Sequence, residues 1–263
     1  MSPSDLAQEV ERYMSDYEIT FVSREHATSW HAHELCKSCG RCVLHGRRST
    51  SCPGVLAADK IELSPQGWGP ARNIVAFTGG DLACQPEFYA KSAELIKELN
   101  KNVWVLFETN GYGLTPTTLD VFQHAGIDSF WLDIKAFNEE VHRRLTGVSN
   151  SHILKLPEAM KERGFVVEVL SLYIPGWVEM DQIANIAKEL AAVDAEIPFT
   201  ILAFFPEYKM RAVPSPTMWQ MIEAYSAAKD AGLRKIKLGN LHLFVHTHDE
   251  YETLEKIVGR DGL

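Results

Sequence analysis

The 263-residue chain lacks any apolar run long enough to span a bilayer, so no membrane segment is expected. Its N-terminus, MSPSDLAQEVERYM, is charged and lacks the apolar stretch of a signal peptide, which predicts a cytoplasmic protein. Positive charge is also scarce, because 26 Lys and Arg stand against 35 Asp and Glu, a net charge of −9. An acidic chain is poorly suited to a phosphate backbone, which disfavours a nucleic-acid partner.

Cysteines are few, but four of the five lie between residues 36 and 52. Disulfides are disfavoured in the cytosol, so clustered cysteines there indicate metal or redox chemistry. Cys36, Cys39 and Cys42 form a C-x2-C-x2-C motif, and Cys52 is followed by a proline. This spacing favours a [4Fe–4S] cluster over zinc, whose usual pattern is two separated C-x2-C pairs. The remaining cysteine, Cys84, is expected to be a buried small apolar residue.

The number of cysteine ligands bears on function. Three ligands leave one iron open to a substrate, whereas four close the cluster and suit electron transfer or a structural role. The sequence leaves open whether Cys52 is the fourth ligand.

Short apolar runs alternate with amphipathic segments beyond residue 73, a pattern typical of parallel βαβ units. The expected strands are Ile74–Phe77, Val103–Phe107, Phe130–Leu132, Val166–Leu172, Phe199–Phe204 and Lys235–Leu238. The expected helices are 86–99, 116–125, 137–145, 152–163, 180–193, 215–231 and 249–257. We interpret residues 1–263 as a single domain: an N-terminal segment, 1–72, with one strand at Glu18–Val22 and the cluster loop, and an α/β part, 73–263.

A polar or glycine-rich segment follows each expected strand. These segments are Thr78–Asp81, Glu108–Gly111, Asp133–Lys135, Pro175–Gly176, Pro206–Lys209 and Gly239–Asn240. The carboxyl ends of parallel strands meet at one edge, where ligands of α/β folds bind. Turn chemistry alone explains the glycines and prolines. It does not explain Glu108, Asp133 and Lys135, charges beside buried strands that need partners such as a zwitterionic ligand.

Taken together, the motifs resemble those of radical S-adenosylmethionine (SAM) enzymes, in the branch of the pyruvate formate-lyase activating enzyme. The matching stretches are FTGGD (77–81), ETNGYG (108–113), LDIKAFNEEVHRRLTGVSN (132–150), YIPGW (173–177), FFPEYKM (204–210) and LGN (238–240). The resemblance implies a partial (β/α)6 barrel of the TIM type. It also implies a [4Fe–4S] cluster whose open iron binds SAM, reductive cleavage of SAM to a 5′-deoxyadenosyl radical, and a flavodoxin or ferredoxin as reductant.

The resemblance assigns expected roles to individual residues. Gly79, Gly80 and Asp81 match a motif that contacts the SAM amino group. Glu108 and Asp133 match acids that help bind a monovalent cation, and Lys135 matches a lysine facing the SAM carboxylate. Asn110 lies in the matching turn after Glu108. Two further segments, Pro175–Gly176 and Gly239–Asn240, match rim segments near the ribose and adenine.

The chain also departs from the family pattern around the cluster. The first cysteine spacer is one residue short, Arg41 replaces an aromatic residue, and Asp81 replaces a glutamate. Beyond a radical SAM enzyme acting on a protein glycine or a small molecule, two other functions therefore stay open. One is a four-cysteine SAM-binding or electron-transfer protein, and the other is a zinc-stabilised binding module. No catalytic residue beyond the cluster ligands is assigned.

Overall fold

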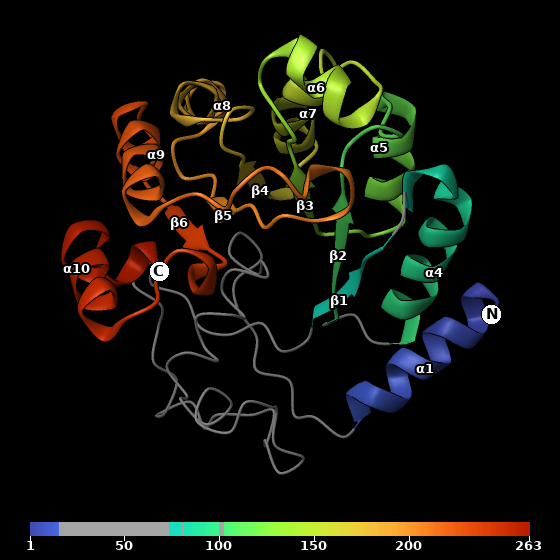
Figure 1. Ribbon diagram of the computed structural model, residues 1–263. Helices are drawn as coiled ribbons and strands as arrows, with labels where there is room; N and C mark the ends of the chain where they lie inside the picture. The colour runs from blue at the N-terminus through green and yellow to red at the C-terminus, as the bar shows by residue number, and fades with distance from the viewer. Residues whose placement is uncertain (16–73, 80–81, 100–102) are drawn as a thin grey trace. The chain divides into compact units, whose positions relative to one another are not determined.

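The computed structural model describes residues 1–15, 74–79, 82–99 and 103–263 (Figure 1). Cys36, Cys39, Cys42 and Cys52, the expected strand Glu18–Val22, and Gly80 and Asp81 lie outside the described residues.

All six strands expected after residue 73 are present. They are β1 (Ile74–Phe77), β2 (Trp104–Thr109), β3 (Ser129–Asp133), β4 (Val166–Tyr173), β5 (Phe199–Ala203) and β6 (Ile236–Gly239). They form one sheet in the order β1-β2-β3-β4-β5-β6, and the pairs β1–β2, β4–β5 and β5–β6 are parallel. Strand order thus follows chain order, as expected of successive right-handed βαβ units, and the predicted α/β class is confirmed.

Helices follow the strands as the sequence predicts. The α-helices after residue 73 are α4 (Pro86–Leu99), α5 (Pro116–His124), α6 (Glu139–Thr146), α7 (Leu156–Glu162), α8 (Met180–Val193), α9 (Met218–Asp230) and α10 (His248–Val258). Short 3-10 segments are η3 (Leu82–Cys84), η4 (Ile153–Lys155), η5 (Tyr208–Met210), η6 (Leu241–Leu243) and η7 (Arg260–Gly262). None of the described helices is long and apolar enough to cross a membrane.

One prediction about local structure is wrong, and one helix lies where none was predicted. Helix α1 (Pro3–Ser15) was not expected, although it begins at a proline suited to a first helical turn. Cys84 is exposed rather than buried, because it ends the short segment η3 just before α4. Proline starts and glycine ends are confirmed elsewhere: α4 and α5 begin at Pro86 and Pro116, and Gly126, after α5, has φ +81°.

The chain divides into two compact units. Unit 1 comprises Met1–Trp131 and Ala159–Val167, and its core is aromatic. Phe107 of β2 contacts the rings of Phe77, Tyr89, Phe122 and Phe130, which come from β1, α4, α5 and β3. Helix α1 packs on α4 in the same unit.

Unit 2 comprises Leu132–Glu158 and Glu168–Leu263. Helices α8 and α9 lie side by side, and α9 also contacts β5, β6 and α10 (Figure 1). One face of β5 is fully buried through Phe199, Ile201 and Ala203, while Thr200 and Leu202 on the other face are only half-buried. The strand therefore has a closed face and a more open one.

A partly buried ion pair ties the start of β2 to the start of β3 in unit 1. The Lys97 ammonium donates to an Asp128 carboxylate oxygen and to the Val103 carbonyl, each at 2.5 Å. The Val105 amide donates to the same carboxylate at 2.7 Å. Asp128 thus neutralises a largely buried cation and satisfies a strand amide as well.

We expect Asp128→Ala to lower the free energy of unfolding by about 3 kcal/mol, because it leaves the Lys97 charge without its buried counter-ion. Urea denaturation measures this loss. The matched control is Asp120→Ala, which removes the exposed partner of Arg163 and costs less than about 1 kcal/mol. Equal losses in the two variants would contradict the structural role given to Asp128.

Candidate functional site at the carboxyl ends of the strands

The segment after β1 begins with Gly79, the one member of its predicted SAM motif that lies among the described residues. Its φ is +87°, a conformation that side chains other than glycine rarely adopt. Gly79 is exposed, and among the described residues a Cβ built on it would meet no atom within 4 Å. The positive φ therefore favours glycine here, without crowding from the described residues.

The turn after β2 carries Glu108 and Asn110. Glu108 is half-buried, and the exposed Asn110 accepts a hydrogen bond from the Tyr112 amide at 2.9 Å, which closes an Asx turn. A Cβ on Gly113 would lie 2.6 Å from the Cβ of Ala83 in η3. The turn after β2 thus packs closely against the segment that follows the TGGD motif.

Asp133 and Lys135 are brought together at the end of β3. The Lys135 ammonium donates to Asp133 Oδ2 at 2.5 Å, and both side chains are partly exposed. The other carboxylate oxygen, Asp133 Oδ1, is buried and has no hydrogen-bond partner among the described residues. A buried carboxylate oxygen normally has a partner, so this atom has capacity for an ammonium group or a cation. Beside it, Lys135 can bind a carboxylate.

The backbone that leaves β3 is held mainly by side chains, beside one hydrogen bond from the Ile134 N–H to the Leu170 carbonyl of β4. The Ser171 hydroxyl donates to the Ile134 carbonyl at 2.8 Å. The Asn150 side chain donates through Nδ2 to the Ala136 and Phe137 carbonyls at 2.9 and 2.7 Å. The backbone N–H of Asn138 donates to Gln182 Oε1 at 3.0 Å. The same Gln182 side chain donates through Nε2 to the Trp177 carbonyl.

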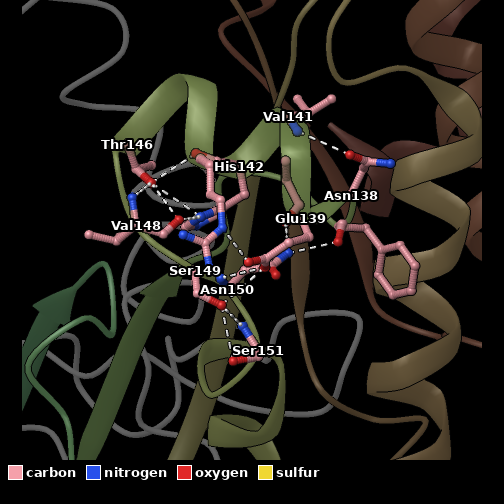
Figure 2. A network of polar contacts seen from close by, with 12 residues as sticks. Asn138, Glu139, Val141, His142, Thr146, Val148, Ser149, Asn150 and Ser151 are labelled. Carbon is pink, nitrogen blue, oxygen red and sulfur yellow. Dashed lines mark hydrogen bonds and ion pairs between the residues drawn. The ribbon is translucent and has the colours of Figure 1, made fainter.

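Asn150 is itself fixed by the loop after α6 (Figure 2). Gly147 ends α6 with φ +85°, and His142 Nδ1 lies 2.9 Å from the Val148 carbonyl. The backbone N–H of Asn150 donates to Glu139 Oε2 at 3.1 Å. This hydrogen bond, followed by that from the Arg143 side chain, lowers the pKa of the Glu139 carboxyl. The LTGVSN stretch therefore presents a buried amide to the exit of β3.

Pro175 and Gly176 form a turn after β4. Gly176 has φ +74°, and its amide donates to Glu179 Oε1 at 3.0 Å. The next residue, Trp177, lies under the Arg144 guanidinium, whose central carbon is 4.3 Å from the ring centroid. A cation–π contact thus joins this turn to α6.

Gly239 and Asn240 have structural roles at the end of β6. A Cβ on Gly239 would lie 2.4 Å from Leu202 Cδ2, so the glycine leaves room for Leu202. Asn240 has the left-handed φ of 58°, which Asn tolerates better than most residues, and its side chain donates to the Ala203 carbonyl at 2.9 Å. Packing therefore explains both residues, and their contact with a ligand stays a prediction.

The sequence patterns predict no role for several polar residues of unit 2. Thr200 pairs in register with Leu170 and Lys237, and side chains alternate along a strand. Glu168 and Lys237 therefore share the face of the sheet that carries Thr200, and both are buried. Their strands have no period-two pattern at these positions, so only the register reveals the shared face.

Among the described residues, no group of three or more His, Cys, Asp or Glu side chains could hold a metal ion. The predicted cluster ligands, Cys36 to Cys52, lie outside those residues and stay predictions.

Comparison with known proteins establishes the family. The radical SAM superfamily matches residues 56–190, a little more than half of the chain, and the chain therefore belongs to that superfamily. This membership implies a [4Fe–4S] cluster and SAM as cofactors.

Named relatives confirm the predicted branch and class of enzyme. A protein of Methanocaldococcus jannaschii named as a glycyl-radical enzyme activating enzyme is 28% identical over 134 residues, 49% of each chain. The pyruvate formate-lyase 1-activating enzyme of Escherichia coli is 26% identical over 113 residues, 42% of this chain and 44% of that relative. The chain thus matches about half the length of these curated relatives.

A solved structure supports the fold. A domain of the pyruvate-formate lyase-activating enzyme from Bacteroides vulgatus superposes with a TM-score of 0.54 at 20% identity. The match covers 63% of this chain and 98% of that domain, so the predicted fold of the radical SAM type is confirmed.

Lys237 gives the stability a distinctive pH dependence. Burial lowers the pKa of its ammonium to about 7, against a smaller opposing effect of Asp261. The unfolded chain, with a lysine pKa of about 10.4, binds one more proton between about pH 7 and 10. Stability contributed by this group therefore rises with pH in that window, by at most about 1.4 kcal/mol per pH unit.

We expect Lys237→Met to be more stable than the wild type at pH 7 and the difference to shrink as pH rises to 10. Urea denaturation at several pH values measures it. Lys229→Met, at an exposed lysine of α9, controls for the loss of a positive charge. A difference that does not change with pH would contradict the prediction.

Proposed function

We propose that this chain is a cytoplasmic radical SAM enzyme that generates a radical for hydrogen abstraction from a glycine of a protein partner. The cluster would be held by Cys36, Cys39 and Cys42, with the open iron as the SAM site. When bound and reduced, the cluster supplies the electron that cleaves SAM to methionine and a 5′-deoxyadenosyl radical. Cysteines kept as metal ligands rather than disulfides fit a cytoplasmic location.

The observation that carries the proposal is the pair at the end of β3. SAM ends in an amino group and a carboxylate, and the site presents the opposite charges. The Lys135 ammonium is the donor for the carboxylate, and the orphaned Asp133 Oδ1 is the acceptor for an ammonium group or a monovalent cation. Both lie at the carboxyl end of a parallel strand, where α/β folds bind ligands.

The choice of a protein glycine rests on the relatives. Those named above are activating enzymes, one for pyruvate formate-lyase and one for a glycyl-radical enzyme. A glycyl-radical protein is therefore the substrate we propose, with a flavodoxin or ferredoxin as reductant. The remaining rim residues, Glu108, Asn110 and the Pro175–Gly176 turn, would complete the binding of SAM and its cation.

The proposed function makes a prediction about SAM cleavage. The full chain, reconstituted anaerobically with iron and sulfide, reduced with dithionite and given SAM, should release 5′-deoxyadenosine. Cys36→Ala, Cys39→Ala and Cys42→Ala should each abolish the product, because each removes one of the three ligands, while Cys52→Ala should retain it. Liquid chromatography with mass detection measures the product, and omission of dithionite is the control.

Three other results of this experiment would favour a different function or a different cleavage. A cluster that requires Cys52 and whose spectrum ignores SAM would favour a four-cysteine electron-transfer or accessory protein. Zinc without iron after anaerobic purification would favour a zinc-stabilised module. Methylthioadenosine as the product would indicate that a different C–S bond is cleaved.

The second prediction concerns Lys135. We expect Lys135→Ala to raise the Kd for SAM about 10- to 100-fold, since a hydrogen bond to a charged group contributes about 1.5–3 kcal/mol. Isothermal titration of the reconstituted protein measures the affinity. Lys188→Ala, at an exposed lysine of α8, is the matched control and should bind SAM like the wild type. Unchanged affinity in Lys135→Ala would remove the residue from the proposed site.

A further inference from the structure

The segment that carries Lys135 has few backbone hydrogen bonds to regular elements. Strand β3 ends at Asp133 and α6 begins at Glu139, and between them only Ile134, which donates to the β4 carbonyl of Leu170, and Asn138, which accepts from the His142 N–H, have backbone partners among the described residues. The peptide groups of residues 134–138 still need partners, because an unpaired buried peptide group costs as much as a lost hydrogen bond. The conformation of this segment decides where the Asp133 and Lys135 side chains stand.

Three side chains from three other places in unit 2 supply those partners. Ser171 on β4 binds the Ile134 carbonyl, Asn150 after α6 binds the Ala136 and Phe137 carbonyls, and Gln182 on α8 binds the Asn138 amide. The Ile134 amide completes the set by donating to the Leu170 carbonyl at 2.9 Å. We name Ser171, Asn150 and Gln182 the β3-exit clamp.

The clamp side chains are buried. Ser171, Asn150 and Gln182 are 0%, 2% and 7% exposed. In such surroundings a hydrogen bond is strong and its geometry is restrictive, so each residue fixes a backbone position rather than merely solvating it. Gln182 also donates to the Trp177 carbonyl, which links the β3 exit to the Pro175–Gly176 turn.

We propose that the β3-exit clamp, with Asn150 at its centre, positions Asp133 and Lys135 for the amino and carboxylate groups of SAM. This inference rests on the proposed function. Asn150 holds two successive carbonyls directly after Lys135, so its loss frees the backbone nearest the ligand-binding ammonium. The clamp residues are positioning residues, since they act through the β3 exit and not on the ligand.

Asn150→Asp is the sharpest test, because the side chain keeps its size but exchanges two N–H donors for acceptors. A carboxylate facing two carbonyls repels them, and the Kd for SAM measured by isothermal titration at pH 8 should rise about 10- to 100-fold. Burial and the two carbonyls raise the pKa of the introduced carboxyl. At pH 6 it should protonate, donate again and recover part of the affinity, whereas the wild type should show no such recovery.

A readout without SAM accompanies the titration. Amide hydrogen exchange of Ile134 and Asn138 in the ligand-free protein should be faster in Asn150→Asp than in the wild type. Tyr225→Phe is the matched control, because it removes a single hydrogen bond, from the Tyr225 hydroxyl to the Val258 carbonyl at 3.0 Å, elsewhere in unit 2. It should change neither measurement at the β3 exit. If Asn150→Asp does not fold, Ser171→Ala provides the same comparison with a smaller expected loss.

The outcomes separate the two proposals. Normal SAM affinity in both clamp variants, with SAM bound by the wild type, overturns the clamp and leaves the proposed function standing. Equal weakening in Tyr225→Phe also overturns the clamp, since the effect would then follow general stability. A wild-type chain that carries its cluster but binds no SAM overturns the proposed function and the clamp with it.

Discussion

The site depends on how the backbone leaves β3. Where a strand ends inside a protein, the peptide groups that follow it need hydrogen-bond partners outside the sheet, because unpaired buried peptide groups are costly. Here most of the partners are buried side chains: Ser171, Asn150 and Gln182 bind backbone groups of residues 134, 136, 137 and 138, while the Ile134 N–H donates to the Leu170 carbonyl of β4. That fixed exit places a carboxylate and an ammonium side by side. Without it, Lys135 would be an ordinary loop lysine that loses entropy each time it meets a ligand.

Much of the fold could be predicted from the sequence, and the reason is local. The strands after residue 73 are β-branched and aromatic runs, two of the helices begin at prolines, and several are followed by glycines, so pattern and propensity agree. Helix α1 was not among the predicted helices, although Leu6, Ala7 and Val10 recur at the spacing of an apolar helix face. Cys84 was judged by residue type, but its place in a short 3-10 turn before α4 decides its exposure.

The charged residues of the candidate site could be predicted from the sequence, but the residues that hold their backbone in place could not. Asp133 and Lys135 could be predicted as site residues because charged side chains beside a buried strand need partners. Asn150, Ser171 and Gln182 carry no such signal, since polar residues in a loop, a strand and a helix have many ordinary explanations. Their roles come from contacts between residues 13 to 44 positions apart, which only the fold creates. Conversely, packing accounts for Gly239 and Asn240, which the sequence pattern assigned to the ligand.

The central claim is that the β3 exit receives the amino-acid end of SAM. The most direct measurement is a crystal structure of the anaerobically reconstituted chain with SAM bound. The account predicts the SAM carboxylate within hydrogen-bond distance of Lys135 Nζ, with Asp133 Oδ1 facing the amino group or a cation. SAM bound away from these residues, with the Lys135–Asp133 pair unchanged and Asp133 Oδ1 still without a partner, would contradict it.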